Sequence, residues 1–259
     1  MKILKHLPFL LLLPTLFGQP IRLLADDIQV AVAANFSAPM ELIATEFEKA
    51  TSHRALLTFG STGKFYTQIQ HGAPFEILLA ADARTPEKLV AEGAALADSR
   101  FTYAIGRLVL WSLNPDLVDA QGAILAEGGF KHLAIASPRL APYGAAAIET
   151  LTRLGLLEMV RSRFVQGENI SQTYQFVASG NAELGFVAKS QVYTAGKLNK
   201  GSGWLVPAEL HNPIRQDAVL LNRGKDNPAA ASLMKYLTSD SARAVIEAYG
   251  YALPPVSPR

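Results

Sequence analysis

Short apolar segments alternate with helical patterns from residue 28 to residue 188 of this 259-residue chain. The helical patterns include Met40, Ile43 and Phe47, which recur at i, i+3 and i+7 on one helix face. The apolar segments are rich in Val, Ile and Leu and have the length of strands: residues 28–32, 55–59, 76–80, 108–111, 133–136 and 184–188. Strands that alternate with helices predict an α/β fold with mostly parallel sheets.

Two segments interrupt this alternation and predict passages between two lobes. They are residues 101–106 and 212–217, where Pro213 breaks the pattern before a last strand. We therefore expect residues 26–104 and 215–259 to form lobe 1 and residues 105–214 to form lobe 2. With 49% hydrophobic residues, the chain is long and apolar enough for a core in each lobe. Two crossings between two lobes predict a cleft between them.

The first 25 residues have the pattern of a signal peptide. Lys2 and Lys5 form a positive region, and the apolar stretch of residues 7–17 is too short to span a bilayer. Ala25 precedes the expected cleavage point. Without residues 1–25 the chain keeps 21 Lys and Arg against 22 Asp and Glu, a net charge of −1. We expect an exported, periplasmic protein that holds an anion by local geometry and not by a global positive field.

Several classes of function have no support in the sequence. Cysteine is absent, which excludes disulfides, thiolate metal sites and a cysteine nucleophile. Lys and Arg do not cluster, which argues against nucleic acid as a partner. The nucleophile elbow, the zinc-protease motif and the dinucleotide-binding glycines are missing, and the five histidines are scattered. We therefore expect a binding protein that is not an enzyme and has no cofactor and no direct metal ligands.

Four strand-to-helix junctions consist of small and mostly uncharged residues. They are residues 33–39, 60–63, 142–144 and 168–171. Backbone N–H groups at a helix start are unpaired, so such a junction can hold an anion. Each junction alone is equally well explained as an ordinary capped helix start. Together they favour a site that surrounds an anion with neutral donors, because ligands of open α/β sheets bind beyond the carboxyl ends of the strands.

Several segments of the chain, in this order, carry a family resemblance: Ala33-Ala34-Asn35-Phe36, Phe59-Gly60-Ser61-Thr62-Gly63-Lys64, Gly72-Ala73-Pro74-Phe75, Ala80-Ala81-Asp82, Ala141-Pro142-Tyr143-Gly144 and Ala182-Glu183-Leu184-Gly185-Phe186-Val187-Ala188. The sequence resembles the periplasmic molybdate-binding proteins of ABC importers (the ModA family) over essentially the whole chain after residue 25. The resemblance implies the type II periplasmic-binding-protein fold. In that α/β fold, two crossover segments join two lobes, and the ligand cleft lies between the lobes.

The resemblance also implies a ligand, molybdate or tungstate, and the residues that bind it. Asn35, with the backbone of Ala34, takes the place of the first anion-binding loop. Thr62, with Ser61 beside it, takes the place of the second. In both loops the expected donors are uncharged amides and hydroxyls.

The third and fourth loops are expected in lobe 2. Tyr143 takes the place of the third loop, and Ile170 donates a backbone N–H as the fourth. Some members of the family add a tyrosine at the position of Ala188, and we expect the Tyr143 hydroxyl to supply that donor here. The implied partners are the oxyanion and the membrane permease of a molybdate ABC transporter, with the chain as a monomer.

Three alternatives compete with this interpretation. They are a binding protein for another tetrahedral oxyanion such as sulfate, the effector-sensing half of a transcription regulator, and an exported enzyme. The signal peptide argues against the second, and the missing nucleophile–base pair argues against the third. No carboxylate occurs among the six candidate residues. The proton of hydrogen phosphate would therefore lack an acceptor, which costs about 1–3 kcal/mol.

Overall fold

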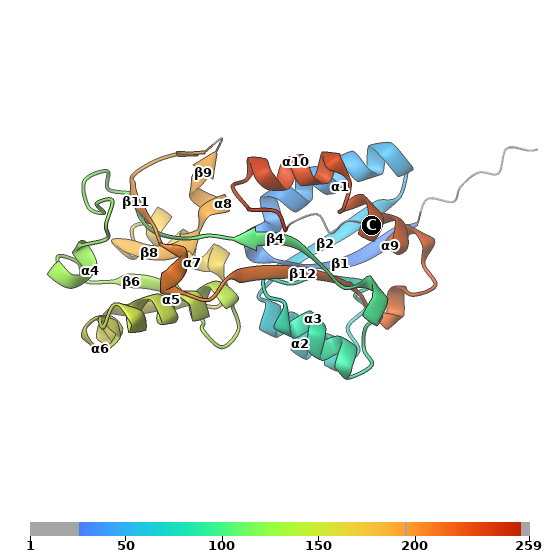
Figure 1. The fold of residues 1–259 in the computed structure, drawn as a ribbon, viewed down its shortest axis with the longest axis horizontal. Helices are drawn as coiled ribbons and strands as arrows, with labels where there is room; N and C mark the ends of the chain where they lie inside the picture. Colours follow the sequence, from blue (N-terminus) through green and yellow to red (C-terminus); the bar gives the residue numbers. More distant parts are fainter. Residues whose placement is uncertain (1–25, 195, 255–259) are drawn as a thin grey trace, which may run out of the picture.

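Two five-stranded sheets, one in each of two lobes, form the framework of the protein in this computed structural model (Figure 1). The structure describes residues 26–194 and 196–254. The expected signal peptide, residues 1–25, lies outside the described residues. The two lobes lie side by side along the longest axis of the molecule (Figure 1).

The sheet of lobe 1 has the strand order β2-β1-β3-β12-β4. Its strands are β1 (Asp27–Ala33), β2 (Arg54–Gly60), β3 (Ile77–Leu79), β4 (Phe101–Gly106) and β12 (Ile214–Leu220). β1 pairs in parallel with β2 and β3, whereas β12 is antiparallel to both β3 and β4. The second half of β1 is buried on both faces, which explains its continuous run of Val and Ala.

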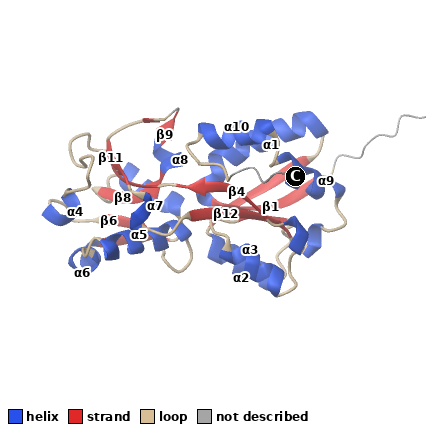
Figure 2. Ribbon diagram, in the orientation of Figure 1, coloured by secondary structure: helices blue, strands red, loops and turns tan. Residues whose placement is uncertain are grey.

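Helices cover both faces of this sheet (Figure 2). They are α1 (Ser37–Thr51), α2 (Thr62–Gln70), α3 (Arg84–Ala91), α9 (Pro228–Tyr236) and α10 (Asp240–Ala248). Side chains alternate along β1, and this alternation divides the core in two. Val30 and Val32 pack with residues of α1, α9 and α10, whereas Ala31 packs with Phe65 of α2 and Leu89 of α3.

The sheet of lobe 2 has the strand order β11-β5-β8-β6-β7. Its strands are β5 (Leu108–Ser112), β6 (Leu133–Ala136), β7 (Phe164–Gly167), β8 (Leu184–Ala188) and β11 (Ser202–Leu205). The helices of this lobe are α4 (Ile124–Glu127), α5 (Pro142–Arg153), α6 (Leu157–Val160), α7 (Ile170–Ala178) and α8 (Lys189–Val192). α5 packs on one face through Ala147 and Leu151, and α7 packs on the other through Val177.

Short elements complete the two lobes. β9 (Tyr193–Thr194) and β10 (Lys197–Leu198) form a small antiparallel pair. The 3-10 helices are η1 (Ala34–Phe36), η2 (Ala97–Ser99), η3 (Arg161–Arg163), η4 (Ala208–Leu210) and η5 (Asn222–Gly224). Of these elements, η1 connects β1 directly to α1.

The sheets differ from the sequence prediction of mostly parallel pairing. β6 is parallel to β7 and β8, but β5 is antiparallel to β8 and β11. Each sheet is therefore mixed. In lobe 1 the reason is that β12 returns from lobe 2 and enters between β3 and β4 in the opposite direction.

The segment Phe101–Gly106, expected as a passage between the lobes, is strand β4 over its whole length. Phe101, Tyr103 and Ile105 are aromatic or β-branched and suit a strand. The expected lobe limits at 104/105 and 214/215 fall inside β4 and β12. The chain leaves the first sheet after Gly106 and enters the second at Leu108.

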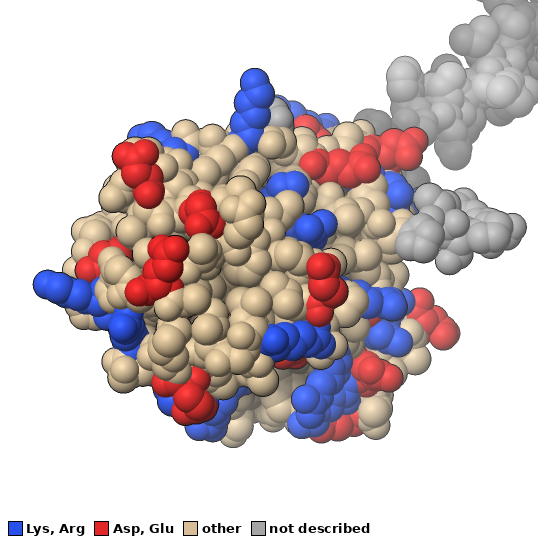
Figure 3. Space-filling view, turned by 60° about the vertical axis from the view of Figure 1, so that its left-hand side comes forward, with Lys and Arg blue, Asp and Glu red and all other residues tan. Residues whose placement is uncertain are grey.

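The surface shows no concentration of one charge on the face drawn in Figure 3, where basic and acidic side chains are interspersed. An anion that approaches this face meets no extended positive field. Within residues 26–194 and 196–254, no helix combines the length and the apolar character needed to cross a bilayer.

Candidate functional site

All six candidate residues line one pocket: Ala34, Asn35, Ser61, Thr62, Tyr143 and Ile170. The remaining lining residues are Ala33, Gly60, Ala81, Ala141, Pro142 and Asn169. None of these residues is charged, so the polar groups of the wall are backbone amides, hydroxyls and side-chain amides. The empty space is about 200 Å³, a volume that includes open solvent at the mouth of the pocket.

The pocket lies where four helices begin. In lobe 1, β1 leads into η1 and β2 leads into α2 at Thr62; in lobe 2, β6 precedes α5 and β7 precedes α7 at Ile170. Because β1 is parallel to β2, and β6 to β7, the carboxyl ends of each pair lie at one edge of the sheet. First-turn N–H groups have no partner inside their own helix and carry the positive end of its dipole. The pocket is therefore built to favour an anion.

Ser61 and Thr62 offer two hydroxyl groups to this pocket. The Thr62 hydroxyl oxygen accepts a hydrogen bond of 2.9 Å from the Ala81 backbone N–H, which leaves its own proton to be donated. Ser61 is 3% exposed, and its hydroxyl has no hydrogen-bond partner within the described part of the chain. Ser61 precedes α2 but makes no side-chain cap hydrogen bond. A buried hydroxyl without a partner lowers the stability of the folded protein by about 1–3 kcal/mol, because its desolvation is not compensated. An acceptor from outside the protein, such as a bound anion, would remove this penalty.

The side chain of Asn35 is committed to other protein groups. Its Nδ2 donates to Gln216 Oε1 at 2.8 Å and to the Tyr251 hydroxyl at 3.0 Å, and all three residues are buried. Asn35 does not cap α1, which begins without a side-chain cap. The backbone N–H of Asn35, in the first turn of η1, is therefore the donor that remains at this position.

Tyr143 lies at the start of α5 and is 1% exposed. Its hydroxyl oxygen accepts a hydrogen bond of 3.2 Å from Gln216 Nε2, a contact between lobe 2 and lobe 1. Burial raises the pKa of Tyr143 well above its ordinary value, so the phenol remains a neutral donor. Gly106, at the end of β4, permits this contact, because a Cβ at that position would collide with the Tyr143 hydroxyl and Gln216 Nε2. Ala188, where the family resemblance implies a tyrosine in some members, does not line the pocket.

The two lobes are in contact around the pocket. Gly63 N–H donates to the Leu140 carbonyl at 2.9 Å, and Lys64 Nζ lies 2.7 Å from Glu168 Oε2. The ion pair joins α2 of lobe 1 to the residue two positions before α7 of lobe 2, and both side chains are about half exposed. These contacts define a closed arrangement in which the charge of Lys64 is neutralised by Glu168.

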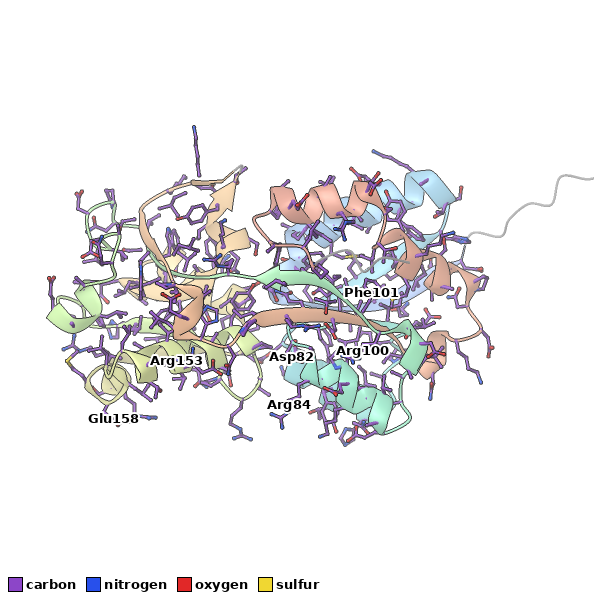
Figure 4. The ribbon with its side chains drawn as sticks, in the orientation of Figure 1. Asp82, Arg84, Arg100, Phe101, Arg153 and Glu158 are labelled. Carbon is purple, nitrogen blue, oxygen red and sulfur yellow. The ribbon has the colours of Figure 1, made fainter. Side chains whose placement is uncertain are left out.

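A buried polar group supports the wall beside Ala81. Asp217 accepts from Arg100 Nη1 at 2.8 Å and from the Thr102 hydroxyl at 2.7 Å. Asp82 and Arg100 lie beside β12 (Figure 4). Burial raises the pKa of the half-buried Asp82, and the nearby charge of Asp217 adds to the effect. Neither carboxylate lines the pocket, whose lining residues are all uncharged.

Across the described ranges, no group of three or more His, Asp or Glu residues is placed to hold a metal ion.

Sequence reasoning missed Gln216 and Tyr251, which fix Asn35 from 181 and 216 residues away. No local signal points to them, because a single Gln and a single Tyr have no distinctive spacing.

Comparisons with known proteins agree with this geometry. A family model described as bacterial extracellular solute-binding protein matches residues 28–252. The molybdate-binding protein ModA of Azotobacter vinelandii is 62% identical over 229 residues, which cover 88% of this chain and 91% of that protein. The ModA protein of Rhodobacter capsulatus is 49% identical over 227 residues, 88% of each chain.

Solved structures give the same picture. The periplasmic molybdate-binding protein of Azotobacter vinelandii aligns with a TM-score of 0.85 at 43% identity, covering 88% of this chain and 99% of that one. The sulfate-binding protein SubI of Mycobacterium tuberculosis, at 10% identity and a TM-score of 0.72, shares the fold. The family match and the two relatives together show that the chain belongs to the bacterial extracellular solute-binding proteins, in the group that contains these ModA proteins.

Proposed function

We propose that this protein is the periplasmic component of a molybdate ABC importer, that it captures molybdate or tungstate between its lobes, and that it delivers the anion to a membrane permease. The observation that carries the proposal is the convergence of four helix starts and the unpartnered Ser61 hydroxyl on one uncharged pocket. The relatives named molybdate-binding protein supply the identity of the anion.

The chemistry of capture follows from the donor set. A dianion that leaves water must receive hydrogen bonds at each of its oxygens. Here the donors are the hydroxyls of Ser61, Thr62 and Tyr143 and the first-turn N–H groups of Asn35 and Ile170. Charge-assisted bonds from fixed donors, helped by the helix dipoles, replace the hydration shell without a counter-charge. Hydrogen phosphate is disfavoured because no carboxylate lines this wall to accept its proton.

Capture also requires closure of the lobes. The donors of residues 34–62 belong to lobe 1, and those of Tyr143 and Ile170 belong to lobe 2. The anion therefore bonds to both lobes only in the closed arrangement and shifts the open–closed equilibrium by its differential affinity. The assignment of residues 26–104 and 215–259 to one lobe and of residues 105–214 to the other is part of this proposal. So are the monomeric state and export by a cleaved signal peptide.

Thermal unfolding of residues 26–259 with added oxyanions tests the proposal. Molybdate or tungstate at about 100 times its dissociation constant should stabilise the protein by about 2.7 kcal/mol. For a chain of this size that is roughly 5–10 °C in Tm. Phosphate should give no shift. A rise in Tm with sulfate alone would identify sulfate, and not molybdate, as the ligand. No rise in Tm with any oxyanion would refute an anion site at the four helix starts.

A further inference from the structure

We infer that Ser171 and Ser190 of lobe 2 are positioning residues that strengthen the first anion loop of lobe 1 when the lobes close. The inference rests on the proposed function and deepens it. The Ser171 hydroxyl donates to the Ala34 carbonyl at 3.2 Å. The Ser190 hydroxyl donates to the Asn35 carbonyl at 2.9 Å.

These two hydrogen bonds cross from one lobe to the other. Ser171 lies in the first turn of α7 and Ser190 in α8, and both helices contact η1. The acceptors are consecutive carbonyls of the loop that follows β1. The serines follow these carbonyls by 137 and 155 residues in sequence and belong to the other lobe, so both contacts depend on the closed arrangement of the lobes.

The chemistry of the peptide unit links these bonds to anion binding. The Ala34 carbonyl belongs to the same peptide unit as the N–H of Asn35, the donor that remains to this residue. A hydrogen bond at a carbonyl oxygen polarises its peptide unit and makes the N–H at the other end a stronger donor. Ser171 therefore strengthens the Asn35 N–H, and Ser190 fixes the orientation of the next peptide unit. The effect disappears when lobe 2 moves away.

The remaining partners of both carbonyls show why the coupling is reversible. The Ala34 carbonyl also accepts from the backbone N–H and the hydroxyl of Ser37. The Asn35 carbonyl also accepts from the Tyr251 hydroxyl at 2.6 Å. Ser37 and Tyr251 both belong to lobe 1, so these acceptor contacts do not depend on closure, although the Tyr251 hydroxyl also lies 3.0 Å from Ser190 Oγ. Neither carbonyl is left unsatisfied in the open form, so the serine bonds add to affinity without locking the lobes shut.

The test compares Ser171→Ala, Ser190→Ala and the double variant with wild type and with Ser179→Ala. Ser179, the residue that follows α7, is the matched control, because its exposed hydroxyl donates to the Gln175 carbonyl of the same lobe. Molybdate affinity is measured by titration calorimetry, and the melting temperature of each protein is measured without ligand. Ser171→Thr and Ser190→Thr, which keep the hydroxyl, serve as rescue variants.

Each alanine variant should bind molybdate about three- to tenfold more weakly, and the double variant more weakly than either. The threonine variants should recover most of the affinity. The unliganded melting temperatures should stay within about 1–2 °C of wild type, which a merely structural role would not allow. Wild-type binding together with unchanged affinity in the double variant would overturn the inference. If wild type itself does not bind molybdate, the proposed function fails instead.

Discussion

Replacement of Ser61 by alanine is the sharpest test of the pocket, because its hydroxyl is buried and finds no partner among the described residues when the lobes are closed. In the anion complex this hydroxyl becomes a charge-assisted donor, worth about 1.5–3 kcal/mol. Ser61→Ala should therefore weaken molybdate binding by about 10- to 150-fold. At a molybdate concentration of 100 times the wild-type dissociation constant, a tenfold loss leaves about 1.4 of the 2.7 kcal/mol of ligand stabilisation.

The same substitution should act in the opposite direction on the unliganded protein. Closure without an anion buries the Ser61 hydroxyl unpaired, which costs about 1–3 kcal/mol and favours the open form. Ser61→Ala removes this penalty and should make the unliganded protein more compact in small-angle scattering. Calorimetry supplies the affinities. Thr67→Ala is the control, since the Thr67 hydroxyl is exposed on the same helix and donates to the Gly63 carbonyl. Unchanged affinity in Ser61→Ala would refute the argument.

Four further predictions follow from the structure. Tyr143→Phe should weaken molybdate binding at least severalfold in calorimetry, and unchanged affinity would reject a donor role for the phenol. Gly106→Ala should lower the free energy of unfolding by about 1–3 kcal/mol in denaturant titrations, because the new Cβ collides with the Tyr143 hydroxyl. Burial raises the pKa of Asp82, so its contribution to stability is full below the unfolded pKa and is lost as pH rises through the folded pKa. Relative to Asp82→Asn, wild type should therefore lose stability as pH rises from about 4 through that window; a constant difference in Tm would contradict the assignment. Lys64 and Glu168 lie on different lobes, so their ion pair is broken in the open form and the charge of Lys64 can then attract the anion. Lys64→Gln should therefore slow molybdate association at low ionic strength and leave it nearly unchanged at about 0.15 M salt; stopped-flow rates with equal losses at both would contradict an electrostatic role for Lys64.

The wall of the pocket could be predicted from the sequence because each part of it has a local signature. A short apolar strand followed by small polar residues marks a helix start, and residues 60–63 and 168–171 show this pattern within a few positions. The expected strand at 184–188 is β8 with the same limits. Both features depend on neighbours in sequence, so they can be read without knowledge of the fold.

The supporting contacts could not be predicted, because they depend on which elements meet in space. Nothing near Ser190 or Tyr251 in sequence indicates that both touch the Asn35 carbonyl. The contact of the Asn35 side chain with Gln216 is equally invisible in the sequence, and it is this contact that leaves the backbone N–H as the donor of Asn35. Residues 101–106 are interpreted from the sequence as a passage, because the pairing partner that makes them a strand, β12, lies far away in the sequence.

The pocket wall is uncharged and its donors are divided between two lobes, which makes release of the anion depend on opening of the lobes. A lysine in the pocket would hold the anion in the open form as well, because its charge acts without precise geometry. Neutral donors act only when aligned, and opening removes Tyr143, Ile170 and the bonds of Ser171 and Ser190 in one movement. The affinity of the open form is then that of lobe 1 alone. A permease that separates the lobes therefore lowers the affinity of the protein for the anion to that of lobe 1 and allows the anion to dissociate. The permease needs no higher affinity of its own, since most of the binding free energy depends on closure.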